Sequence, residues 1–215
     1  MANWIITGAS GSMGSALIDE LLKKGKSLTC YSRSEIQDER INFKKVEGYD
    51  DLEFEFQVCE GLIIVQGFFH FEEIKNLDSQ NLENIIEANF VSQIQVVKNF
   101  LKHADERDRT DVVILGSTSA FHAGRGTTVY GAAKAGMLGF VRALNEEYKD
   151  TDIRFWFVST GTLSNEMGAK VPNQDPSSLL DPKLIAKRIV DAVTSDTNLW
   201  EPEITIRRRH IKLVD

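Results

Sequence analysis

The stretch that decides the fold is residues 4–22, WIITGASGSMGSALIDELL. It begins with the apolar run Trp4-Ile5-Ile6, which is typical of a short buried strand, and continues directly into a glycine-rich turn. After the turn, apolar residues recur at helical spacing up to Gly25. A strand, a glycine turn and a helix in this order are typical of a dinucleotide-binding unit. The glycines let the backbone approach a pyrophosphate, and the amino terminus of the helix meets its charge.

The predicted pyrophosphate contacts are the residues of this turn and of the start of the helix. They are Gly8, Ser10, Gly11, Ser12, Met13 and Gly14. A second strand is predicted over residues 27–31, and it is followed directly by Ser32 and Arg33. These two residues are expected at the edge of the sheet where ligands bind, beyond the carboxyl ends of the strands.

Strands and helices are predicted to alternate along the rest of the chain. Further strands are expected over residues 42–47, 61–65, 112–115, 152–158 and 203–207. Helices are expected over residues 50–60 (brief and acidic), 79–103 and 129–148, with a last one that begins at Pro182. This order predicts an α/β fold, a Rossmann-type doubly wound parallel sheet of about seven strands in a three-layer α/β/α arrangement. We expect residues 1–215 to form a single domain.

Composition and charge exclude several other classes of protein. The chain has 215 residues, 42% of them hydrophobic and 27% charged, as expected of one soluble globular domain. The net charge of -7 and a pI near 5.2 disfavour nucleic acid as a partner. We interpret the basic run at 207–210 as the solvated end of the last strand. No apolar run is long enough to span a bilayer, so no membrane partner is expected.

The cysteines and histidines show no metal-ligand spacing, so no metal site is predicted. Cys30 and Cys59 lie in apolar or strand-like contexts, and no secretory leader precedes the first strand. Buried free thiols in a reducing compartment are the simplest interpretation, which predicts a cytoplasmic protein.

A candidate reaction centre lies in residues 115–140, LGSTSAFHAGRGTTVYGAAKAGMLGF. Tyr130 and Lys134 are four residues apart, so they would project from the same face of a helix. A neighbouring ammonium favours the phenolate, so Lys134 is expected to lower the pKa of Tyr130 and to suit it to proton transfer. Ser117 follows a buried strand and is expected at the edge of the sheet where ligands bind.

At these residues the chain resembles the compact members of the short-chain dehydrogenase/reductase family. The resemblance implies that Ser117, Tyr130 and Lys134 are catalytic. It also implies that Asn89 is a fourth catalytic residue, which kinks its helix and holds a water that passes protons to the lysine. From the residue alone, a polar Asn beside core positions is more often a satisfied structural amide.

The resemblance extends to the cofactor, with departures from the family pattern. Ser12 replaces the middle glycine of the usual turn, and the glycines alternatively match the extended members, which carry a further substrate domain. In NAD-preferring relatives an acid at the end of the second strand holds the adenosine ribose, but this chain has Ser32 at that position. The next residue, Arg33, resembles the arginine that binds the 2'-phosphate in NADP-preferring members, so NADP is favoured over NAD. The usual Asn-Asn-Ala-Gly after the fourth strand is reduced to Gly67. Near the nicotinamide, Gly161 is kept and Asn165 stands where relatives have Thr.

The implied function is an NADP(H)-dependent oxidoreductase that interconverts a carbonyl and an alcohol on a small substrate. Two other classes remain open, namely a non-catalytic NAD(P)-binding sensor of the same fold and a lyase or epimerase of the extended type. The phenylalanines among residues 68–71 could wall an aromatic substrate pocket or belong to the core, and residues 168–180 are expected to form a mobile lid. Relatives usually dimerise through the two long helices, so a homodimer through 79–103 and 129–148 is expected.

Overall fold

The computed structural model describes residues 3–49, 52–54, 58–195, 197 and 199–209. Its seven strands form one parallel sheet in the order β3-β2-β1-β4-β5-β6-β7, which confirms the predicted doubly wound topology. The chain crosses from one edge to the centre between β3 and β4, so β1 and β4 flank the switch point. The strands are β1 (Asn3–Thr7), β2 (Ser27–Ser32), β3 (Asn42–Lys45), β4 (Cys59–Ile64), β5 (Thr110–Leu115), β6 (Ile153–Thr160) and β7 (Glu203–Ile206).

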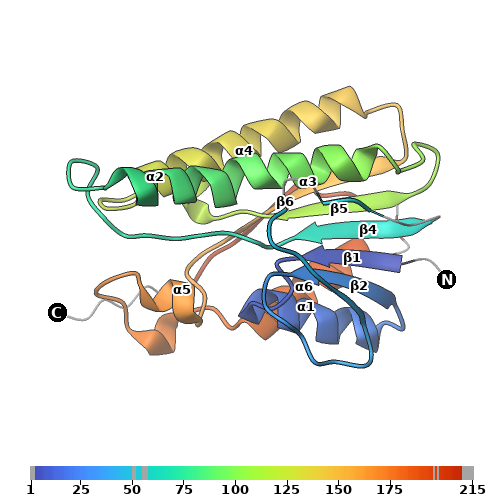
Figure 1. Cartoon of the computed structure of the whole chain (residues 1–215), viewed down its shortest axis with the longest axis horizontal. Coiled ribbons are helices and arrows are strands. Elements are labelled where there is room, and N and C mark those ends of the chain that lie inside the picture. Colours follow the sequence, from blue (N-terminus) through green and yellow to red (C-terminus); the bar gives the residue numbers. More distant parts are fainter. Residues whose placement is uncertain (1–2, 50–51, 55–57, 196, 198, 210–215) are drawn as a thin grey trace.

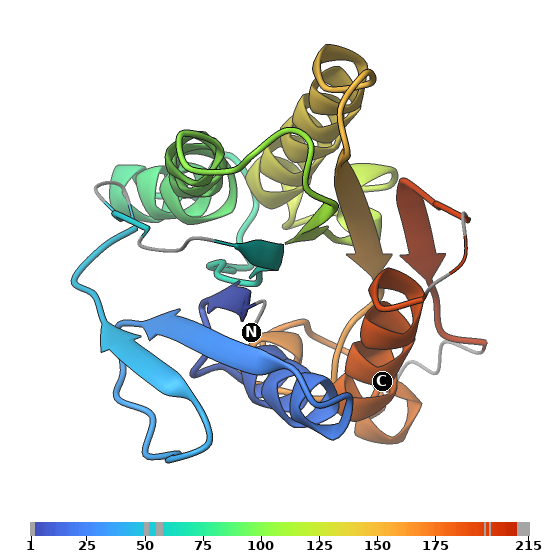
Figure 2. The ribbon, with the colours of Figure 1, turned by 90° about the vertical axis from the view of Figure 1, so that its right-hand side faces the viewer.

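Helices cover both faces of the sheet, and Figures 1 and 2 show the resulting three layers. Helices α1 (Ser12–Lys23) and α6 (Pro182–Val193) lie together on one face. Helices α2 (Ser79–Ile86), α3 (Ser92–Leu101) and α4 (Thr128–Glu147) cover the other. In Figure 1 the strands run toward the left, where the short helix α5 (Glu166–Ala169) lies beyond their carboxyl ends.

Each face of the sheet has its own hydrophobic core. On one side Leu17 of α1 and Ile189 of α6 are fully buried against β1, β2 and β6. On the other, Val97 of α3 and Met137 of α4 are fully buried against β4, β5 and β6. Burial on both faces explains why the central strands are continuous apolar runs rather than alternating ones.

The long helix predicted over residues 79–103 is interrupted. A π-helical turn, η1 (Glu87–Val91), separates α2 from α3, and the helix ends at Leu101. The turn contains Asn89, as the predicted kink requires. One extra residue per turn rotates the side chains that follow, and such bulges frequently occur at functional sites.

The acidic helix predicted over residues 50–60 is wrong in the part that the structure describes. Residues 52–54 and 58 are not helical, and Cys59 and Glu60 already belong to β4. Residues 50–51 and 55–57 lie outside the described chain, as does His210 of the basic run at 207–210. The described residues contain no helix that is both long and apolar enough to cross a bilayer. Cys30 and Cys59 are buried free thiols, and burial raises the pKa of each to about 12.

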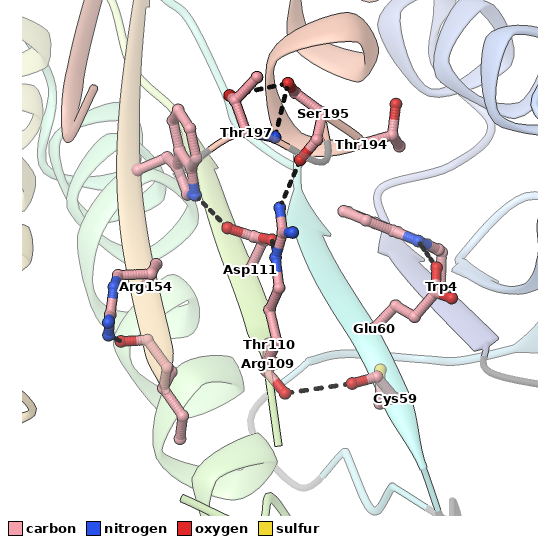
Figure 3. Close-up of polar contacts among 12 residues, drawn as sticks. Trp4, Cys59, Glu60, Arg109, Thr110, Asp111, Arg154, Thr194, Ser195 and Thr197 are labelled. Atoms are coloured by element: carbon pink, nitrogen blue, oxygen red, sulfur yellow. Dashed lines mark hydrogen bonds and ion pairs between the residues drawn. The ribbon is translucent and has the colours of Figure 1, made fainter. Parts of the chain in front are cut away.

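A polar cluster lies at the opposite end of the sheet from α5, at the start of β5 (Figure 3). The carboxylate of Asp111 accepts a hydrogen bond of 2.7 Å from Nε1 of Trp156. Arg109 lies 3.6 Å from the same carboxylate and donates to the carbonyl oxygen of Ser195 at 2.8 Å. Burial is the largest influence on Asp111 and raises the pKa of its carboxyl group. This cluster links β5, β6 and the residues after α6 at the amino end of the sheet. The loops at the carboxyl ends of the strands do not take part in it.

Candidate functional site

A cavity of about 500 Å³ opens beyond the carboxyl ends of the strands, at the switch point of the sheet. All the residues predicted to bind or react line this one cavity, although they come from seven different parts of the chain. They are Gly8, Ser10, Gly11, Ser12, Met13, Gly14, Ser32, Arg33, Gly67, Asn89, Ser117, Tyr130, Lys134, Gly161 and Asn165.

The candidate reaction centre is built from β5 and the first turns of α4. Ser117 follows β5 and caps the short 3-10 helix η2 (Thr118–Ala120), where its Oγ accepts from the backbone N–H of Ser119 at 3.1 Å. The side chain of Ser117 interacts with that of Tyr130 and acts to lower the pKa of the phenol. The Nζ of Lys134 lies 5.8 Å from the centre of the Tyr130 ring and donates to the carbonyl oxygen of Leu115 at 3.1 Å. The spacing of four residues therefore brings phenol and amine to the same side of α4.

The pKa of Tyr130 is raised, whereas the sequence predicted that Lys134 would lower it. Its side chain is buried, and loss of hydration raises its pKa to about 12, while the hydrogen bond from Ser117 lowers it less. Lys134 is also buried, at 3% exposure, and burial lowers the pKa of its amine to about 8. In the protein without ligand, desolvation therefore dominates both groups, and the ammonium does not produce the acidic phenol that the spacing predicts.

Asn89 projects from the π-helical turn into the cavity wall. Its Nδ2 donates to the carbonyl oxygens of Phe68 at 2.6 Å and Ile85 at 2.9 Å. Its Oδ1 has no hydrogen-bond partner among the described residues, although the side chain is 1% exposed. A buried acceptor of this kind requires a partner, such as an ordered water. Asn89 is thus both a structural amide, through its nitrogen, and an unsatisfied acceptor at the cavity.

The glycine turn has the shape that an anionic ligand requires. Gly8 has φ +76°, and a Cβ there would lie 2.5 Å from the backbone nitrogen of Gln66. Gly14 packs α1 so closely onto the backbone of Ala9 that a side chain would clash. Helix α1 begins after Gly11 with no side-chain cap, so its first N–H groups are available to a ligand. These features fit the pyrophosphate of a dinucleotide, which the fold family binds at this place.

Gln66 is a cavity residue that the sequence did not indicate as functional. It directly follows the Val65 that extends β4, and its Oε1 accepts from the hydroxyl group of Thr7 at 2.6 Å. Its Nε2 is buried and has no partner among the described residues. An amide held by one end and unsatisfied at the other is a ready hydrogen-bond donor to a ligand beside Gly8. Its position at the carboxyl end of a predicted strand, where ligands of such sheets bind, is the feature of the sequence that could have indicated it.

At the end of β2, Ser32 is buried and donates to the hydroxyl group of Ser10 at 2.5 Å. Arg33 is exposed at the cavity edge, and in the described part of the chain its guanidinium makes no hydrogen bond or ion pair with another side chain. Its charge reaches Tyr49, whose pKa is raised by burial and lowered less by Arg33. Tyr49 also lines the cavity and was not predicted to do so.

The segment predicted as a lid, residues 168–180, contributes Gly168, Val171 and Gln174 to the cavity lining. It contains the end of α5, followed by the 3-10 turn η3 (Pro176–Ser178), and Leu180 pairs with Leu163 as an isolated bridge. Asn165 caps α5 by accepting from the N–H of Gly168 at 2.8 Å, and its Nδ2 donates to Oγ of Ser12 at 3.1 Å. Both ends of the Asn165 amide are thus engaged by the protein.

The aromatic residues after β4 divide between the cavity and the core. Phe69 and Phe71 line the cavity, and the Phe69 ring packs edge-on against Tyr130, 5.0 Å between centres. Phe68 packs in the small hydrophobic cluster around Tyr130 and does not line the cavity. Other lining residues were not singled out from the sequence, and they include Ser34, Thr118, Ser119, Gly124, Arg125, Thr127, Thr162, Leu163, Met167, Val171 and Gln174.

Comparison with known proteins agrees with this architecture. The family model described as short chain dehydrogenase matches residues 44–176, more than half of the chain. An uncharacterized oxidoreductase of Staphylococcus epidermidis is 22% identical over 220 residues, covering 94% of this chain and 95% of that protein.

Among solved structures, a short-chain dehydrogenase/reductase from Vibrio parahaemolyticus superposes with a TM-score of 0.78 at 21% identity, covering 96% and 100% of the two chains. The structure described as ElxO with NADP bound gives a TM-score of 0.83 at 18% identity, covering 96% and 97%.

The fold and the cavity define an α/β protein of the doubly wound type with a ligand-sized cavity at its switch point. The chain belongs to the short-chain dehydrogenase family, and it is an NAD(P)-dependent oxidoreductase.

Proposed function

We propose that this protein uses NADP(H) to interconvert a carbonyl and an alcohol on a small substrate, with Tyr130 as the general acid and base. One observation carries the proposal. A single cavity is lined by Ser117, Tyr130 and Lys134, and it also contains the uncapped amino terminus of α1. A protein that only bound a dinucleotide would have no chemical use for the first three.

In the reducing direction, the residues act on the carbonyl oxygen. Tyr130 is protonated below about pH 12, so it is available as a proton donor throughout the physiological range. Ser117 donates a hydrogen bond to the same oxygen as negative charge develops, a role in which one donor contributes about 2.7 to 4 kcal/mol. A bound nicotinamide supplies or accepts the hydride.

Lys134 and Asn89 support the proton transfer. Lys134 is held by the carbonyl oxygen of Leu115 and retains two further N–H donors for a ribose hydroxyl or a water. The unsatisfied Oδ1 of Asn89 is the acceptor that a relay water requires. Together these groups carry a proton between Tyr130 and solvent while the centre itself stays buried.

The preference for NADP rests on the end of β2. Arg33 is exposed at the cavity edge between Ser32 and Ser34, where an adenosine ribose would lie. A guanidinium binds a 2'-phosphate through paired charge-assisted hydrogen bonds, and among the described residues that line the cavity there is no acid to oppose it. The solved structure described with NADP bound shows that this fold accommodates that cofactor.

Assembly as a homodimer through α2–α3 and α4 is part of the same proposal. Leu82 on α2 and Val91 at the π-helical turn remain more than a third exposed on this side of the molecule. An apolar surface of this kind on paired helices favours association with a second copy. Sedimentation of the purified chain gives the oligomeric state directly.

The test is NADPH oxidation over a panel of aldehydes and ketones, with Tyr130→Phe as the decisive variant. We expect Tyr130→Phe to abolish turnover while NADPH affinity, measured by fluorescence, stays within a few-fold. Ser117→Ala is expected to lower kcat by about 10²- to 10³-fold. An unchanged rate in Tyr130→Phe would refute the acid role.

The sensor alternative has one observation in its favour, namely that the Asn165 amide is already engaged by Ser12 and Gly168. Tight NADPH binding with no turnover of any carbonyl in the panel would support it. Tightly retained cofactor together with net conversion of a substrate, but no net oxidation, would point instead to a lyase or epimerase.

A further inference from the structure

The charged residues that line the cavity are all cations. They are Arg33, Lys134 and Arg125, and no aspartate or glutamate lines it within the described chain. This contrasts with the whole protein, in which 32 acidic residues outnumber 25 Lys and Arg. Arg33 lies at the dinucleotide end and Lys134 in the reaction centre, so the proposed function accounts for both. Arg125, on the substrate side, has no role in it.

Arg125 is held at the cavity edge by a rigid turn five residues before Tyr130. Gly126 has φ +77°, and its carbonyl oxygen accepts from the N–H of Glu72 at 3.0 Å. The Phe71 ring packs against Gly126 so closely that a Cβ there would lie 2.5 Å from it. A backbone fixed in this way positions the guanidinium beside the cavity without fixing the side chain itself.

The present partner of Arg125 is Glu73, which is outside the cavity lining. The two side chains form an ion pair, but the Arg125 side chain is 82% exposed, and Glu73 also lies 3.8 Å from Lys75. Exposed ion pairs contribute little to stability because water solvates both charges well. A ligand carboxylate can therefore replace Glu73 on the guanidinium at small cost.

The cavity wall next to the reaction centre is apolar. Phe69 and Phe71 come from the loop after β4, Met167 comes from α5, and Val171 comes from the lid segment. These four side chains belong to the same hydrophobic cluster as Tyr130 and would contact the part of the substrate that carries the carbonyl. Such a wall favours an aryl or similarly large apolar group over a small polar one.

We infer that the substrate is an apolar, aryl-sized keto acid, whose carboxylate pairs with Arg125 while its apolar body lies against Phe69, Phe71, Met167 and Val171. The inference rests on the proposed function and deepens it. In the reaction, hydride from NADPH is added to the ketone carbon and a proton from Tyr130 to its oxygen. The products are the hydroxy acid and NADP⁺, and the carboxylate is unchanged.

The test compares keto acids with their neutral esters. Benzoylformate, 3-benzoylpropionate and 4-benzoylbutyrate are each assayed against the methyl ester, and levulinate serves as the aliphatic counterpart of 3-benzoylpropionate. For at least one aryl acid we expect kcat/KM to exceed that of its ester by about tenfold, mostly through KM, as for one charge-assisted hydrogen bond. We expect levulinate to be a poorer substrate than 3-benzoylpropionate.

Two variants should move the acid-to-ester ratio in opposite directions. Arg125→Gln removes the guanidinium, so the ratio should fall to about one. Glu73→Gln removes its competitor, so the ratio should rise about two- to fivefold by the effect of one surface charge. Arg107→Gln is the matched control, because Arg107 is also an exposed arginine in an ion pair, with Asp105, outside the cavity lining. It should leave the ratio unchanged.

The inference is overturned if the wild type uses acids and esters with equal kcat/KM, or if Arg125→Gln does not change the acid-to-ester ratio. In either case, turnover of the esters still supports the proposed function. Absence of turnover for every carbonyl overturns the proposed function instead. In that case binding of 4-phenylbutyrate, measured by calorimetry with NADP⁺ present, still decides the inference. Binding that Arg125→Gln weakens about tenfold supports it, and equal or absent binding overturns it.

Discussion

Nδ2 of Asn165 donates a hydrogen bond of 3.1 Å to Oγ of Ser12, and so joins the cap of α5, which leads into the lid segment, to the first residue of α1 across 153 positions of the chain. Both residues stand where the chain departs from the family pattern, since Ser12 replaces a glycine and Asn165 replaces a threonine. The two departures are therefore a single structural feature. The hydroxyl proton of Ser12 is left free to donate to a phosphate oxygen while its oxygen holds the lid.

Restoring the glycine should loosen the lid. In Ser12→Gly the acceptor for Asn165 is lost, and one hydrogen bond contributes about 0.5 to 1.5 kcal/mol, so NADPH should dissociate roughly two- to tenfold faster. Stopped-flow fluorescence measures that rate. Ser15→Gly is the matched control, because it makes the same substitution in the first turn of α1 without touching the lid. Equal effects of the two variants would show that helix propensity, not the bond to Asn165, is responsible.

Arg33 should set the choice of cofactor. Arg33→Gln should weaken NADPH binding by about 10- to 100-fold, since hydrogen bonds to charged groups contribute about 1.5 to 3 kcal/mol, and should leave NADH binding nearly unchanged. Arg40→Gln is the control, because Arg40 lies in the same loop but is bound by Asp38 and Asp19. The measurement is the ratio of dissociation constants for the two cofactors. If the preference for NADPH over NADH fell equally in Arg33→Gln and Arg40→Gln, it would depend on the net positive charge of the loop and not on a contact of Arg33 with the phosphate.

Activity should decline above about pH 8. Burial lowers the pKa of Lys134 to about 8, so its amine loses the proton, and with it the positive charge, as pH rises through that value. We expect kcat/KM for carbonyl reduction to show an alkaline limb near pH 8, because this quantity reports on the free enzyme. In Lys134→Arg the guanidinium stays charged, so any remaining activity should lack that limb. The control Lys102→Arg changes an exposed lysine on the surface and should retain the limb.

The same group affects stability. The folded protein releases the Lys134 proton near pH 8, whereas the unfolded chain keeps it to about 10.5. The unfolded state therefore binds more protons in between, and the contribution of Lys134 to the free energy of unfolding should rise from pH 8 to 10.5. Urea unfolding of wild type and Lys134→Met across this range measures it. A difference that is constant with pH would contradict the lowered pKa.

Asp111, at the amino end of the sheet, should tolerate substitution only by a residue that can still accept the hydrogen bond from Trp156. In Asp111→Leu the Nε1–H of Trp156 loses its 2.7 Å partner, so we expect a loss of about 1 to 3 kcal/mol in the free energy of unfolding. Asp111→Asn keeps an oxygen for that bond and should cost less than about 1 kcal/mol. Chemical denaturation monitored by tryptophan fluorescence compares the two variants.

The pH dependence of this pair gives a second check. Burial raises the pKa of Asp111 above 3.8, so the folded state binds its proton at higher pH than the unfolded chain. Relative to Asp111→Asn, the wild type should therefore lose stability as pH rises from about 3.8 through the raised pKa. A difference in the opposite direction would mean that the contacts with Arg109 and Trp156 outweigh burial.

Local patterns were enough to predict most of the fold. The apolar runs, the glycine turn and the spacing of Tyr130 and Lys134 each depend on residues a few positions apart, where backbone geometry is regular. The order of these elements then leaves few topologies, because crossovers between parallel strands are right-handed. One exception was the helix predicted over residues 50–60, because the described residues 52–54 and 58 are not helical and Cys59 and Glu60 belong to β4. The other was the helix predicted over 79–103, which the π-helical turn interrupts.

What the sequence determined by itself was therefore the parallel sheet, the cavity end of that sheet and part of the cavity lining, which did not include Gln66, Tyr49 or Arg125. Only the tertiary structure decided how those side chains interact. The hydrogen bond of Asn165 to Ser12 and the ion pair of Arg125 with Glu73 each join residues that are far apart in the sequence. The unpaired Nε2 of Gln66 likewise depends on what the folded chain places around it. The pKa of Tyr130 likewise follows from how much water the surrounding chain removes, and burial is a property of the whole fold.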